Sequence, residues 1–160
     1  MGCTVQCRET GKCCDNFDVN LICAWTKELL ASLQAKPGLG MEKAIKRCSK
    51  THYDMLDMDK ILEPFVGHPE AFLEFLQEKW NWIVTVEEGG RRIIADENKA
   101  ECVCPLVRSA AVDTANLCNC SEGFAERMFG KVFGRPVRAR VAESVLRGGK
   151  HCVYEVTVGE

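Results

Sequence analysis

The hydrophobic pattern of this chain changes its period near residue 81. Upstream of that point, apolar residues recur every four positions and form one stripe: Leu21, Trp25, Leu29 and Leu33. Such a stripe predicts an amphipathic helix. Downstream, residues 82–86 are mainly β-branched or aromatic, which is typical of a strand. A helical part followed by strands predicts an α+β fold.

Four helical segments are expected within residues 17–80. The first ends at Pro37-Gly38, because these residue types terminate helices. The second carries four residues on one apolar face: Met41, Ala44, Ile45 and Cys48. A third segment spans 53–62. The last begins near Pro69, because proline is favoured in the first turn of a helix.

A β-hairpin and a further helix are expected after the helical part. The hairpin joins residues 82–86 and 91–95 through a turn that contains two glycines. The helix follows Ser121, a residue type that caps helix N-termini well, and it ends near Gly134.

The chain ends in an antiparallel hairpin. Its strands cover 136–146 and 150–158, and Gly148-Gly149 forms the turn between them. We therefore expect a single α+β domain over 17–160, in which 17–80 is helical and 81–160 holds the strands. A cysteine-rich arm over 1–16 precedes it and carries Cys3, Cys7, Cys13 and Cys14.

Charge and hydropathy exclude several classes of partner. The chain has 160 residues, the size of one domain, with Lys+Arg 21, Asp+Glu 23 and a formal net charge of -2. This balance argues against a nucleic acid partner, which usually requires a basic surplus. No apolar run has the length of a secretory signal or of a transmembrane helix. We expect a cytoplasmic protein with no membrane partner.

Cysteine is the outlying residue type, with 11 in the chain. In a reducing compartment, cysteines more often bind metals, carry redox chemistry or pack in the core than form disulfides. Two Cys-x-Cys pairs stand out, Cys102 with Cys104 and Cys118 with Cys120. Zinc accepts thiolate and carboxylate ligands, and iron–sulfur clusters use four cysteines. Metal ligation and core packing are both open for each cysteine.

Glu143 lies in an otherwise apolar row of the C-terminal hairpin. Because side chains alternate along a strand, it is expected to share a face with Val137, Ala139, Val141 and Val145. A buried carboxylate needs a partner. Around a two-residue turn, Glu143 lies diagonal to Cys152, so the two side chains are within reach of one cation. A basic residue of a neighbouring segment is the alternative partner.

Cys120 is the third candidate ligand. It lies at the expected start of a helix, where the macrodipole lowers the pKa of a thiol and favours the thiolate. The full set of candidate metal ligands is Cys120, Glu143, Cys152, Cys104, Cys118 and Cys102. Cys48 and His52 also have a spacing that suits a metal, but Cys48 fits the apolar face of its helix and core packing is favoured.

The segment 117–156 resembles the end of the 4-vinyl reductase domain, whose superfamily also resembles the thiazoline-carboxylate hydrolase-like proteins. It is similar, too, to an uncharacterised bacterial branch of that superfamily. The shared pattern is a cysteine, a helix with an early glycine, a strand with a glutamate, a glycine-rich turn and a final cysteine before an aromatic residue. Here these are Cys120, Gly123, Val141 with Glu143, Gly148-Gly149, Cys152 and Tyr154.

The resemblance implies a small-molecule-binding fold that is often a homodimer. It also implies a zinc ion held by a glutamate and cysteines, which match Glu143, Cys120 and Cys152, with Cys104 or Cys118 as substitutes for the remaining ligand. We therefore expect a zinc-binding domain that binds a small organic ligand or senses it. The alternatives are a hydrolase of a cyclic thiazoline-like substrate, which needs an open metal position or an activated thiolate such as Cys120, and an iron–sulfur or redox protein.

Overall fold

The structure is a computed structural model that describes residues 40–104, 107–108 and 115–159. The expected arm over 1–16 and the first expected helix lie outside the described residues, and both stay predictions.

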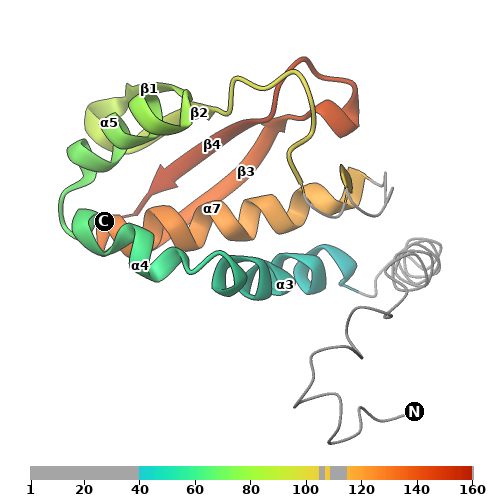
Figure 1. The fold of residues 1–160 in the computed structure, drawn as a ribbon, viewed down its shortest axis with the longest axis horizontal. Coiled ribbons are helices and arrows are strands. Elements are labelled where there is room, and N and C mark those ends of the chain that lie inside the picture. The colour runs from blue at the N-terminus through green and yellow to red at the C-terminus, as the bar shows by residue number, and fades with distance from the viewer. Residues whose placement is uncertain (1–39, 105–106, 109–114, 160) are drawn as a thin grey trace, which may run out of the picture.

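The described elements follow the order that the change of period predicts (Figure 1). The helical part consists of α3 (Met41–Met55), α4 (Met58–Leu62), η1 (Glu63–Phe65) and α5 (Pro69–Trp80). A hairpin follows, made of β1 (Ile83–Glu87), η2 (Glu88–Gly90) and β2 (Arg92–Asp96). The last part consists of η3 (Ala115–Leu117), α7 (Cys118–Phe133), β3 (Val137–Glu143), η4 (Val145–Arg147) and β4 (Val153–Val158). The α+β class is confirmed.

The four strands form one antiparallel sheet in the order β1-β2-β4-β3. Helix α7 packs against β3 and β4, and α3 packs against α7 (Figure 1). The core includes side chains of 0% exposure from the helices and the sheet: Phe72, Leu76, Ile93, Met128, Phe129, Val132 and Val156. Arg138 and Arg140 are exposed on the other face of β3, as its alternation predicts.

The start of α5 and the end of α7 lie where local residue types predict them. Helix α5 begins at Pro69, and α7 is followed by Gly134 in the left-handed conformation (φ 62°), the usual C-cap of a helix. The start of α7 differs from expectation. The helix begins at Cys118 after Leu117 and has no side-chain cap, so Ser121 lies inside its first turns. The segment around Cys118 and Cys120 is therefore helical.

The buried face of α3 does not include Cys48. Ile45, Ser49 and Tyr53 are buried, whereas Cys48 is exposed. The expectation that Cys48 packs in the core is wrong, because α3 turns a small polar residue toward α7. Ser49 is 0% exposed, and its hydroxyl donates to the Lys46 carbonyl (2.6 Å) and accepts from Arg127 Nε (3.2 Å).

A β-bulge at the end of β3 changes the direction of Glu143. Val141 pairs with Tyr154, yet Glu143 pairs with Val153, so two residues of β3 oppose one residue of β4. The bulge reverses the alternation: Glu143 is exposed, and the next residue, Ser144, is buried. The expectation that Glu143 lies in the apolar row is wrong. Its carboxylate instead accepts a hydrogen bond from the Lys150 backbone N–H (2.6 Å).

The connection between β3 and β4 is longer than the expected two-residue turn. Residues 144–152 separate the strands and include η4. Ser144 stabilises this connection, because its hydroxyl accepts from the Arg147 backbone N–H (3.2 Å).

Candidate ligand-binding pocket

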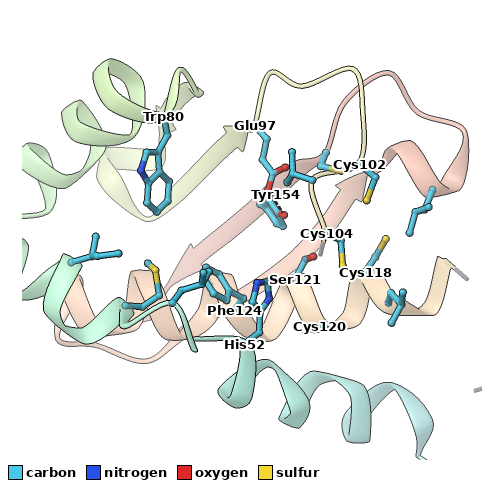
Figure 2. A pocket seen from close by; sticks show the side chains of 17 residues that line it. His52, Trp80, Glu97, Cys102, Cys104, Cys118, Cys120, Ser121, Phe124 and Tyr154 are labelled. Carbon is cyan, nitrogen blue, oxygen red and sulfur yellow. Dashed lines mark hydrogen bonds between the residues drawn. The ribbon is translucent and has the colours of Figure 1, made fainter. Parts of the chain in front are cut away.

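A pocket with a volume of about 450 Å³ lies between the helices, the end of the sheet and the segment 97–104 (Figure 2). Volumes of this size are typical of small-molecule sites. Much of its wall is apolar or aromatic, with Leu56, Met58, Ile61, Trp80, Val103, Leu117, Phe124 and Leu146. An apolar wall favours a ligand that brings hydrocarbon surface out of water.

Helices α3 and α7 place two rings against each other in this wall. His52 lies near the end of α3, Phe124 lies in α7, and their ring centroids are 4.9 Å apart. Burial lowers the pKa of His52, which favours its neutral form. The ring of His52 therefore acts here as an aromatic wall element.

The polar part of the pocket is a carboxyl–phenol pair. Tyr154 of β4 donates from its hydroxyl to Glu97 Oε1 at 2.7 Å (Figure 2). Glu97 follows β2 and is 8% exposed, and Tyr154 is 6% exposed. Burial raises the pKa of Glu97, and it raises the pKa of Tyr154 well above its ordinary range. The pocket thus contains a buried acid and a buried hydroxyl, which suit a molecule that has a polar group.

The position of Glu97 depends on the sheet. Ile93 and Ala95 of β2 are buried, and Glu97 continues the same alternating face. Its backbone N–H donates to the carbonyl of Cys152 (3.0 Å), so the chain beyond β2 remains attached to the chain that enters β4. The tertiary structure thereby holds Glu97 beside Tyr154.

Five cysteines line the pocket: Cys102, Cys104, Cys118, Cys120 and Cys152. Figure 2 shows the labelled cysteines toward one side of the pocket and Trp80 toward the other. The thiol of Cys118 donates to the Ser144 hydroxyl at 3.3 Å. These residues come from the segment 97–104, α7 and the chain before β4, so only the tertiary fold brings them to one cavity.

Burial favours the protonated form of three pocket thiols, those of Cys102, Cys120 and Cys152. Burial raises the pKa of Cys120 and of Cys152 to about 11 each, and it also raises the pKa of Cys102. The expectation that the helix start lowers the pKa of Cys120 is wrong, because desolvation of a buried thiolate dominates. A thiol that stays protonated is a poor nucleophile, which weighs against Cys120 as a catalytic group.

Of the six candidate metal ligands, Glu143 alone does not line the pocket. Within the described ranges, no group of three or more His, Cys, Asp or Glu side chains is arranged to hold a metal ion. Zinc or iron–sulfur ligation by the cysteines stays a prediction. None of the helices in the described part of the chain is long and apolar enough to cross a membrane.

Glu97 is not among the residues that the sequence singles out, and Tyr154 appears there only as the aromatic residue of the shared pattern. The signal that singles out Glu143 is also present at Glu97. Glu97 continues the alternation of Ile93 and Ala95, so it too is an acid in an apolar row. Apart from the cysteines, the remaining wall residues carry no local signal for a ligand site.

Comparison with known proteins gives a family without a described activity. The family described as "Family of unknown function (DUF6144)" matches residues 15–160. No curated protein matches the sequence. Among solved structures, the chain is similar to a trafficking protein particle complex subunit 3 from Naegleria fowleri covalently bound to palmitic acid, at 13% identity and a TM-score of 0.46. That match covers 89% of this chain and 96% of the other. A likeness of this degree carries no argument about the function of this chain.

Proposed function

This chain belongs to the DUF6144 family, and we propose that it binds a small, largely apolar organic molecule in the pocket beside α7. The observation that carries the proposal is the combination of an apolar cavity of about 450 Å³ with one buried polar pair, Glu97 and Tyr154. Ligand sites commonly join apolar walls to a few placed polar groups. The proposed role of such a site is to bind the ligand, to sense it, or both.

Octanol is a suitable first probe, because it has a hydrocarbon body and one hydroxyl. Two tryptophans of the described chain differ in position: Trp80 lines the pocket, and Trp82 packs beside it with ring centroids 5.7 Å apart. We expect a saturable change of tryptophan fluorescence as octanol is added. The change should persist in Trp82→Phe and be lost in Trp80→Phe, because Trp80 contacts the ligand.

Calorimetric titration of the unmutated chain checks the same binding without a fluorophore. A change that grows linearly with octanol concentration, or one that survives in Trp80→Phe and disappears in Trp82→Phe, would place the binding elsewhere and contradict the proposal.

Metal binding by the pocket cysteines is the second candidate function. The observation that favours it is that five of the six candidate ligands line one cavity. Four of them, Cys104, Cys118, Cys120 and Cys152, come from two separate segments and α7, so a metal would tie these parts together. Their side chains would have to converge further to coordinate an ion, since the described residues hold no preformed cluster.

Elemental analysis tests the metal candidate. If the cysteines bind zinc, protein purified without added metal should contain roughly one zinc ion per chain. Cys152→Ala should lower that content severalfold, because it removes a pocket thiol. Cys48→Ala is the matched control, since Cys48 is exposed on α3 and outside the pocket. Metal far below one ion per unmutated chain, or equal loss in both variants, would reject the site.

A further inference from the structure

The described part of the pocket wall carries formal charge of one sign. Glu97 is the one Asp or Glu among the described residues that line the pocket, and no Lys or Arg is among them. Its carboxyl group is buried and receives a hydrogen bond from a neutral phenol. A buried carboxylate without a cation is costly, and a ligand that supplies positive charge would offset part of that cost by pairing with it.

The charged side chains described near Glu97 contact other groups. Asp96 precedes it and contacts His151, whose Nδ1 is 3.0 Å from Asp96 Oδ2. The cation nearest in sequence is Lys99, which lowers the pKa of Glu97 through its charge but donates from Nζ to the carbonyl of Trp80 (3.3 Å). In the part of the chain that the structure describes, Glu97 forms no salt bridge of its own.

The walls around this carboxyl group suit the rest of an organic cation. Aromatic rings of Trp80, Phe124 and Tyr154 line the cavity, and their faces attract cations while their area packs against hydrocarbon. An anionic amphiphile is disfavoured, because its carboxylate would enter the same space as Glu97 without a described basic residue beside it.

We propose that the ligand of this pocket is an organic amine whose ammonium group donates to the carboxylate of Glu97 and whose hydrocarbon part packs on the aromatic and aliphatic walls. This inference rests on the proposed small-molecule function and names the chemical class of the ligand. Tyr154 acts as a positioning residue, because its hydroxyl holds one oxygen of Glu97 at 2.7 Å.

Three probes of equal chain length test the inference at neutral pH: octylammonium, octanol and octanoate. Calorimetric titration should give octylammonium the lowest Kd, roughly tenfold or more below that of octanol, because its hydrogen bond to Glu97 is charge-assisted. Octanoate should bind most weakly. Glu97→Gln keeps the shape of the side chain and should remove the preference for the amine while octanol still binds.

Asp96→Asn is the matched control, since Asp96 loses the same charge one residue away and does not line the pocket. It should retain the amine preference. The inference fails, while the proposed function stands, if octanol or octanoate binds the unmutated chain as tightly as octylammonium does. It fails also if Glu97→Gln binds octanol but retains the amine preference. If none of the three probes binds, both proposals fail. The comparison on the unmutated chain decides even where Glu97→Gln does not fold.

Discussion

Gly123→Ala is expected to lower the free energy of unfolding by about 2–3 kcal/mol, because the added methyl group has no space between α7 and α3. A Cβ at this position would lie 2.4 Å from the Lys46 carbonyl oxygen and 2.5 Å from Ser49 Oγ. The first of these atoms is backbone, so the two helices must separate. Alanine gains roughly 0.5–1 kcal/mol over glycine in a helix, which does not offset the clash.

Gly130→Ala in the same helix is the matched control. Its Cβ would meet nothing nearer than the Arg135 carbonyl oxygen at 3.7 Å, an ordinary contact. We expect this variant to raise the free energy of unfolding by roughly 0.5–1 kcal/mol, because only the gain in helix propensity remains. Urea unfolding followed by tryptophan fluorescence measures both variants.

Gly123→Ala should also weaken ligand binding. Moving α3 away from α7 separates His52 from Phe124, whose rings are 4.9 Å apart in the pocket wall. We expect the Kd for octanol to rise in Gly123→Ala and to stay unchanged in Gly130→Ala. Equal stability of the two variants would show that the helices do not approach each other as closely as the structure indicates.

Phe129→Ala is expected to cost about 3–5 kcal/mol of folding stability, the range for removing a buried aromatic ring and leaving a cavity. Phe129 belongs to α7, is 0% exposed and packs in the hydrophobic core. Its ring meets Phe72 of α5 edge-on, with centroids 5.3 Å apart, so the loss removes the main aromatic contact between the two helices.

Phe133→Ala, four residues further along α7, provides the comparison for this prediction. Phe133 is only half-buried and contacts Phe129 at 6.1 Å between ring centroids. Its loss should cost clearly less, because less surface is removed from contact and the gap is open to water. Thermal unfolding by circular dichroism ranks the variants. A smaller loss for Phe129→Ala than for Phe133→Ala would contradict the described core.

Most secondary structure of the described chain could be predicted from local pattern. The first turn of α5 at Pro69, the hairpin of β1 and β2, and the end of α7 at Gly134 all lie near their expected positions. Residue types set these features through backbone geometry and side-chain alternation, which act over a few neighbours. The predicted start of α7 is wrong. Ser121 is of a residue type that caps helices, but it lies inside a helix that begins at Cys118.

The two acids near the sheet show where this reasoning stops. Glu143 and Glu97 both continue an apolar alternation, yet one is exposed and the other buried. The difference comes from the pairing of β3 with β4, where an extra residue at the bulge reverses the faces. β2 pairs with β4 without a bulge, so its alternation carries through to Glu97. Register between strands is a property of the partner strand as well as of the strand itself.

The composition and the hydrophobic periods of the chain alone are sufficient to determine the α+β class and the approximate places of its elements, because these depend on interactions between near neighbours. The pocket was decided by tertiary packing. It requires α7, α3, the chain beyond β2 and the chain before β4 to meet, and it places the five cysteines and the Glu97–Tyr154 pair around one cavity. Contacts between segments so distant in sequence leave no periodic trace in any one of them.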